Sequence, residues 1–208
     1  MRMEPLPRLA QVSPGYGVCV SDFDNDGLED ILMATNFFGS QPETGYMDGG
    51  LGWLLKGQKN KTFTPSWPNE SGVVVDGDGN GLAILDVDND GDQDAIFAVN
   101  NQRVRMLKNQ SEKQGVQIIV SGVPGNGSGI GTRFVLLGEE GDGEPYRQAF
   151  EISAGGSYLA QPSAQKTVSV EGIEKTRVVE IHWPDRTESK LEDPRPKNGQ
   201  LVLRYPTK

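Results

Sequence analysis

Short runs of apolar residues alternate with Gly- and Asp-rich polar segments along the whole chain. No apolar pattern at helical spacing continues for about a dozen residues, whereas short apolar runs bounded by turn residues are typical of β-strands. The composition agrees, because 27 glycines and 13 prolines supply turn residues every few positions. The pattern therefore predicts an all-β chain.

One arrangement occurs twice: an apolar run, an Asp-rich loop and a second apolar run. The loops are Asp22–Asp30 and Asp86–Asp94, so the offset is 86 − 22 = 64 residues. This exceeds the roughly 40–50 residues of common propeller blades but fits four strands plus a long loop in each repeat. The Gly-rich polar stretch from Phe37 to Gly52 has no periodic pattern, and we expect it to be a surface insertion that accounts for the extra length. Each copy is predicted to be one blade of a partial β-propeller.

Both loops carry aspartate at positions 1, 3, 5 and 9 and glycine at position 6. Carboxylates at this spacing can wrap around one hard cation, and glycine permits the tight turn between them. A single Asp-Asn-Asp-Gly cluster could equally be a solvated hairpin turn, but the repeated spacing favours a metal, with calcium as the best match. The predicted ligands are Asp22, Asp24, Asp26, Asp30 and the Leu28 carbonyl for one Ca²⁺, and Asp86, Asp88, Asp90, Asp94 and the Asp92 carbonyl for the other.

The helix-flanked EF-hand begins with the same residues but requires a bidentate acidic residue at position 12 of the loop. Position 12 is Met33 in the first copy and Phe97 in the second. The flanking runs are also short and apolar, as in strands. We therefore expect each loop to join two strands of one blade.

The chain changes character after about residue 109, where the Asp-rich loops stop. A polar bridge, Ser111–Gly115, leads into apolar runs separated by turns that contain glycine or proline. This change predicts two domains, residues 1–112 with the two blades and residues 113–208 as a small β-sandwich or barrel. The predicted strands of the second domain are Val116–Val120, Thr132–Leu137, Arg147–Ile152, Arg177–Trp183 and Gln200–Leu203.

Charge and rare residues exclude several functions. With 29 acidic and 20 basic residues the net charge is −9, which opposes binding to nucleic acids. Cys19 and His182 are the only cysteine and histidine, so intrachain disulfides, Cys/His zinc sites and most histidine-based triads are excluded. No segment is apolar enough to span a membrane, and the start of the chain lacks the apolar core of a signal peptide. Either the protein is cytoplasmic, or its export signal lies on a longer parent chain.

The repeated Asp-x-Asp-x-Asp-Gly-x-x-Asp loop between apolar strands resembles the FG-GAP/VCBS repeats of integrin-like propellers, over about residues 10–110. Residues of about 115–206 resemble an ASPIC/UnbV domain through Gly129–Arg133, Gly155–Gln161 and Ile181–Asp185. Together they resemble the C-terminal part of proteins related to cartilage acidic protein. The resemblance implies calcium held between the first two strands of each blade, an extracellular, cell-surface or periplasmic location, and an adhesion-like role without catalysis.

Our leading hypothesis is therefore a non-catalytic, calcium-binding module whose partner is an unidentified protein or glycan. A hydrolase or lyase acting on polysaccharides, or a purely structural repeat unit of a larger exported protein, are the alternatives. Closed propellers have four to eight blades, so two blades leave open edges. We expect further blades of a longer parent chain, a second copy of this chain or another protein to cover them.

Overall fold

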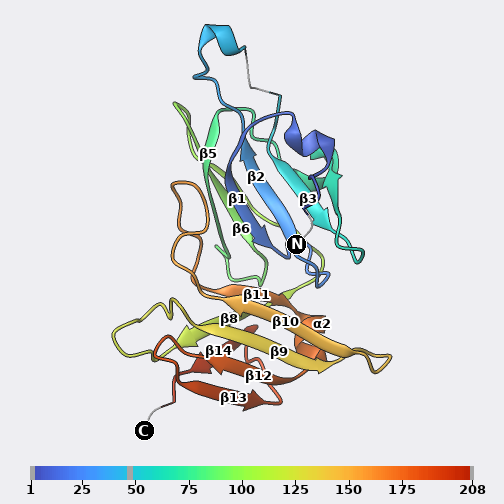
Figure 1. Cartoon of the computed structure of the whole chain (residues 1–208), viewed down its shortest axis with the longest axis vertical. Helices are drawn as coiled ribbons and strands as arrows, with labels where there is room; N and C mark the ends of the chain where they lie inside the picture. Colours follow the sequence, from blue (N-terminus) through green and yellow to red (C-terminus); the bar gives the residue numbers. More distant parts are fainter. Residues whose placement is uncertain (1–2, 46–48, 207–208) are drawn as a thin grey trace.

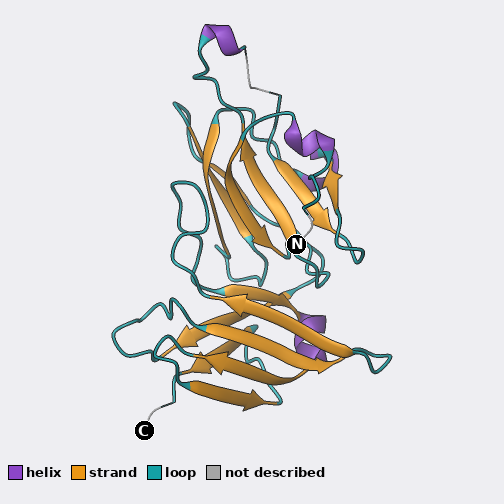
Figure 2. Cartoon of the chain, viewed as in Figure 1, coloured by secondary structure: helices purple, strands orange, loops and turns teal. Residues whose placement is uncertain are grey.

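The computed structural model describes residues 3–45 and 49–206, and it confirms the all-β prediction. Four sheets make up two groups, one above the other along the long axis (Figures 1 and 2). No strand of the first group, β1–β7, pairs with a strand of the second, β8–β14, within these residues. The predicted domain boundary lies in the connection between β7 and β8. No helix in the described part of the chain is long and apolar enough to cross a membrane.

The first sheet, called blade 1, is a four-stranded antiparallel meander. Its strands are β1 (Gly15–Ser21), β2 (Asp30–Thr35), β3 (Trp53–Gly57) and β4 (Phe63–Ser66). A short helix, α1 (Pro68–Ser71), follows it, and a 3₁₀-helix, η1 (Arg8–Gln11), precedes it. The predicted insertion lies between β2 and β3 and contains a second 3₁₀-helix, η2 (Pro42–Thr44); residues 46–48 of it are outside the described part.

The second sheet, called blade 2, consists of β5 (Gly79–Leu85), β6 (Asp94–Val99) and β7 (Arg105–Leu107). It repeats the meander of blade 1 but has three strands, so the expectation of four strands in each repeat is wrong for this copy. After β7 the chain enters the connection that leads to β8 without forming a fourth strand of this sheet.

Strand alternation gives blade 1 two apolar faces. On one face Leu32 and Ala34 belong to a buried cluster with Leu82 and Phe97 of blade 2. The opposite face places its own apolar residues in a separate cluster with the segment that precedes β1. The members of that cluster are Ala10, Met33, Trp53 and Leu55, with Leu6, Val18, Ile31 and Phe63 packed against them. The N-terminal segment therefore covers the outer face of blade 1.

The second group is a sandwich of two sheets. One has the order β10-β9-β12-β13 and the other the order β11-β8-β14, in which β14 runs parallel to β8. Its largest buried side chains include Phe134, Leu136, Ile118 and Leu203, which share one core cluster. The elements are β8 (Gly115–Ser121), β9 (Arg133–Glu139), β10 (Pro145–Glu151), β11 (Lys166–Ser169), α2 (Val170–Lys175), β12 (Thr176–His182), β13 (Glu188–Glu192) and β14 (Gln200–Arg204).

The five strands predicted in this region are therefore confirmed. The sequence analysis missed β11, β13 and α2. β13 alternates charged and less exposed residues at the surface, and β11 is only four residues long, so neither gives the apolar run on which the prediction depended.

Candidate metal centres

Each Asp-rich loop connects the first two strands of its blade, as predicted. Loop 1 (residues 22–30) joins β1 to β2, and loop 2 (residues 86–94) joins β5 to β6. The position-12 residues, Met33 and Phe97, are buried on β2 and β6. Strands and not helices flank both loops, so the EF-hand alternative does not apply.

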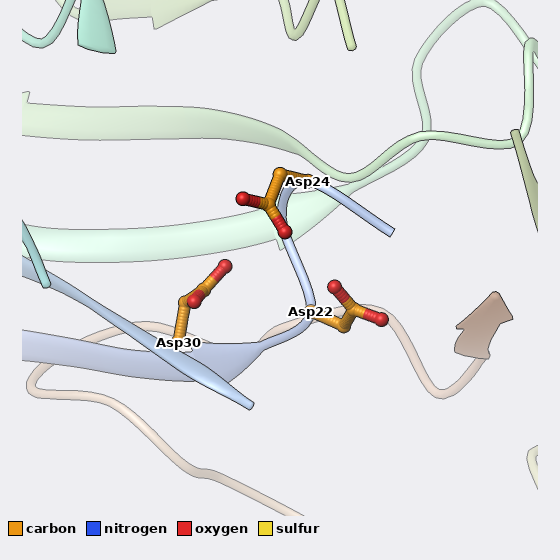
Figure 3. Close-up of side chains that lie close together, drawn as sticks. All are labelled: Asp22, Asp24 and Asp30. Carbon is orange, nitrogen blue, oxygen red and sulfur yellow. The ribbon is translucent and has the colours of Figure 1, made fainter. Parts of the chain in front are cut away.

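The structure brings the carboxylates at positions 1, 3 and 9 together in both loops. One oxygen from each residue of a group lies within 4.8 Å of the others. The groups are Asp22, Asp24 and Asp30 in loop 1, and Asp86, Asp88 and Asp94 in loop 2. Figure 3 shows the three side chains of loop 1 gathered at the turn between β1 and β2. Such a group can hold a metal ion.

The two loops share one hydrogen-bond pattern. The carboxylate at position 1 accepts from the backbone N–H groups of positions 5 and 6, at 3.0 and 2.8 Å in loop 1 and at 3.2 and 2.9 Å in loop 2. The carboxylate at position 9 accepts from the N–H of position 2, at 3.0 and 2.9 Å respectively. The backbone turns through positive φ at Asn25 and Asn89 (52° and 60°) and at Gly27 and Gly91 (90° and 94°). The same spacing has therefore folded in the same way twice.

The third strand of each blade adds two groups that the sequence analysis missed. The N–H of Gly57 donates to Asp30 at 2.8 Å, and the N–H of Asn109 donates to Asp94 at 2.7 Å. The residue before each donor is a lysine. Lys56 lies 3.0 Å from a carboxylate oxygen of Asp24, and Lys108 pairs with Asp88 and Asp90 of loop 2.

A sequence signal for these lysines existed, because a Leu-Lys pair lies near the end of the third strand of both blades, with Lys56 one residue before the end of β3 and Lys108 directly after β7. From position 9 of the loop to the lysine there are 56 − 30 = 26 residues in blade 1 and 108 − 94 = 14 in blade 2. The excess of 12 residues lies where the insertion was predicted. Allowing for the insertion aligns the two lysines.

The loops differ in burial. At position 1 Asp22 is buried and Asp86 is half-buried, and at position 3 Asp24 is half-buried and Asp88 is exposed, whereas Asp30 and Asp94 at position 9 are both buried. Burial raises the pKa of Asp22 to about 7 and that of Asp30 to about 6, although backbone N–H donors oppose this. In the absence of an ion, burial therefore moves the protonation of both carboxylates toward neutral pH.

Loop 1 also contains a buried oxygen with no partner. Oδ1 of Asp24 has no hydrogen-bond partner among the described residues, while its Oδ2 contacts Lys56. An unsatisfied buried carboxylate oxygen is costly, and a cation ligand would satisfy it. The donor set, carboxylate oxygens from one short loop, matches what Ca²⁺ requires.

The remaining predicted ligands lie outside these groups. Asp26 is exposed and accepts a hydrogen bond from the N–H of Leu28 at 2.8 Å, and Asp90 accepts one from the N–H of Asp92 at 3.1 Å. Ligand roles for Asp26 and Asp90, and for the carbonyls of Leu28 and Asp92, stay predictions.

The side chain of Asp92 has a different contact, which the sequence analysis did not anticipate. It is buried and accepts a hydrogen bond of 2.7 Å from the Asn25 side chain of loop 1, which also donates to the Lys113 carbonyl at 3.0 Å. Burial and the neighbouring Asp90 charge raise the pKa of Asp92 to about 6. Asn25 therefore links the two loops and the connection to β8.

The loops also contact the sandwich. Gln117 of β8 donates to Asp86, Gln93 donates to Thr167 of β11 at 2.5 Å, and a Cβ on Gly91 would meet the Gly115 carbonyl oxygen at 2.7 Å. The candidate metal centres therefore lie at the junction between the two groups of sheets.

The fold and these loops define an all-β repeat module with paired acidic turns. Comparison with family models agrees: residues 22–97 match an FG-GAP-like repeat, and residues 122–208 match the ASPIC and UnbV domain. The chain thus consists of an FG-GAP-like repeat region followed by an ASPIC/UnbV domain, as the sequence motifs suggested. The comparison with curated proteins gives no match.

Proposed function

We propose that this chain is a non-catalytic, calcium-binding module of an extracellular or cell-surface protein, in which Ca²⁺ stabilises the two blades. FG-GAP-like and ASPIC/UnbV regions suggest such a setting. The single observation that supports calcium best is the unpartnered, buried oxygen of Asp24 within a carboxylate group that recurs in loop 2.

The metal is proposed to be structural. Each loop carries several carboxylates within a few ångströms, and like charges at 4 Å repel by about 4 kcal/mol at an effective dielectric constant near 20. A divalent cation removes this repulsion, and an ion present at a hundred times its Kd adds about 2.7 kcal/mol to the free energy of unfolding. Calcium is expected to stabilise the blades and the junction beneath them.

Calorimetric titration with Ca²⁺ tests the proposal. The unsubstituted chain should bind two ions. Asp24→Asn and Asp88→Asn should each remove one of these ions while they retain the shape of the side chain. Asp142→Asn, in an exposed turn of the sandwich, is the matched control and should bind both. Thermal unfolding of the metal-stripped and calcium-loaded chains should show a rise in Tm with calcium that the double variant Asp24→Asn, Asp88→Asn lacks. If the unsubstituted chain shows no heat of calcium binding and no change in Tm with calcium, the proposal is refuted.

The hydrolase or lyase alternative requires two carboxyl groups placed on either side of a scissile bond. The most closely grouped carboxylates here already bind backbone N–H groups or lysines. We therefore expect no turnover on a panel of acidic and neutral polysaccharides with calcium present. Turnover that is lost on changing an acid outside both loops would establish the alternative.

A further inference from the structure

Blade 2 has an open edge at β7. Within the described residues β7 pairs with β6 alone, whereas β3, the equivalent strand of blade 1, is covered by β4. An edge strand presents N–H and C=O groups that can pair with another strand. The comparison of the two blades thus identifies a vacant position for a fourth strand.

The β7 edge is short and basic, but unlike the edge of blade 1 it has no proline and it exposes apolar side chains. β4 contains Pro65, which has no N–H to donate. At β7, by contrast, Val104 and Met106 are 61% and 51% exposed, and no proline occurs nearby.

A groove of about 710 Å³ lies beside this edge, between the two blades. Its lining includes Leu32 and Leu54 of blade 1 and Ala95 and Leu107 of blade 2. Leu107 lies opposite Ala95 in the register of β6 and β7, so both face blade 1. Inward side chains of an added fourth strand would enter this groove.

The charge of the edge indicates which strand it accepts. Arg103, Arg105 and Lys108 fall in a stretch with no acidic residue between Asp94 and Glu112, in a chain of net charge −9. Arg105 pairs with Asp76, and Lys108 pairs with loop 2, but Arg103 has no ion pair among the described residues. Antiparallel pairing with β7 of a second copy would bring these basic residues together, which is unfavourable.

We propose that the open edge of β7 binds an extended acidic segment of a partner protein as the fourth strand of blade 2. Backbone hydrogen bonds to β7 supply the pairing, apolar side chains enter the groove over Leu54 and Leu107, and carboxylates lie beside Arg103. The proposal goes beyond the calcium-binding function proposed above, and it does not require metal in the loops.

Selection of short linear peptides from a random displayed library against the biotinylated chain tests the proposal. The selected peptides should be acidic, and in NMR titrations they should shift the amides of Val104–Lys108 and of Leu54. Arg103→Glu should weaken their binding by about tenfold, equal to about 1.4 kcal/mol. Arg147→Glu, on the exposed face of edge strand β10, is the matched control and should have no effect.

N-methylation of the selected peptide tests strand pairing without altering the protein. Only alternate residues of an added strand direct their N–H groups to β7. Methylating one alternating set of amides should therefore abolish binding, and methylating the other set should be tolerated in solution. Equal tolerance of both patterns would overturn the proposal, as would peptides with no acidic bias, peptides that bind elsewhere, or failure to select any.

Sedimentation equilibrium tests a second copy as the occupant: a dimer whose formation shifts the NMR signals of the Val104–Lys108 amides would overturn the acidic partner. Peptide binding is measured both with calcium and after removal of metal. Binding in both conditions without a calcium response in Tm would support this inference and refute the metal centres. A calcium response in Tm without peptide binding would refute this inference and support the metal centres.

Discussion

The equivalent glycines of the two loops make a matched pair that tests how loop 2 rests on the sandwich. Gly27 and Gly91 both have positive φ, 90° and 94°. Their surroundings differ, because a Cβ on Gly27 would have its nearest contact at 3.7 Å, the Ser169 hydroxyl, whereas a Cβ on Gly91 would lie 2.7 Å from the Gly115 carbonyl oxygen. Alanine at both positions therefore shares the backbone strain but not the steric clash.

The magnitudes follow from these two contributions. Left-handed backbone costs a non-glycine residue about 1–2 kcal/mol, which is the expected destabilisation for Gly27→Ala. Forcing extra volume into packed structure costs about 1–3 kcal/mol more, and the atom in the way at Gly91 belongs to backbone that cannot rotate aside. Gly91→Ala should therefore destabilise the chain by about 2–5 kcal/mol.

Urea unfolding of the parent and the two variants, without metal and with saturating calcium, measures the difference. Trp53 in blade 1 and Trp183 in the sandwich are both buried, so fluorescence reports on both halves. Gly115→Ala is the reciprocal variant, since its Cβ would lie 2.6 Å from the Gly91 carbonyl oxygen, and it should be at least as destabilising as Gly91→Ala. Equal destabilisation by Gly27→Ala and Gly91→Ala would refute the packing of loop 2 against β8.

Three further predictions concern the loops. The folded pKa of Asp22, about 7, exceeds its ordinary value of 3.8, so the folded metal-free chain binds a proton there more tightly than the unfolded chain does. This residue's contribution to the free energy of unfolding is therefore lost as pH rises from about 4 to about 7. Urea unfolding should show a smaller loss of unfolding free energy over this pH range for Asp22→Asn, and equal pH profiles would contradict this. Lys108→Met should strengthen calcium binding at loop 2 by no more than about fivefold in calorimetry, since exposed ion pairs contribute little. Weaker binding would mean that the lysine supports the site. Asn25→Ala should lower the free energy of unfolding by about 1–3 kcal/mol more than Asn89→Ala does. Asn25→Ala leaves the buried Asp92 carboxylate without its hydrogen-bond donor, whereas Asn89 is the equivalent, exposed residue of loop 2. Similar losses for the two variants would show that the link between the loops is unimportant.

The sequence predicts the carboxylates of each candidate metal centre because they all belong to one short loop. Nine consecutive residues with aspartate at positions 1, 3 and 9 cannot place those carboxylates far apart once the glycine turns the chain. The strand flanks follow from the apolar runs, and so does the exclusion of the EF-hand by Met33 and Phe97.

The part that sequence could not predict comes from residues distant in the chain. Lys56 and Gly57 reach loop 1 only because β3 pairs with β2 after an insertion of no regular pattern. Asn25 and Asp92 are 67 residues apart, and each looks like an ordinary loop residue. The missing fourth strand of blade 2 is also invisible to motif analysis, because the motif ends at the loop and its flanks.

An incomplete propeller must protect the surfaces that neighbouring blades would otherwise cover. The outer face of blade 1 is covered by its own N-terminal segment, through Leu6 and Ala10. The ends of the blades that carry the acidic loops rest on the sandwich, through contacts such as that of Gln117 with Asp86. β7 has neither kind of cover, and its arginines oppose pairing with a second copy while leaving the backbone accessible. Because other parts of the chain cover the outer face of blade 1 and the loop ends of the blades, while the β7 edge is open and basic, this edge offers an acidic partner backbone and apolar surface to bind.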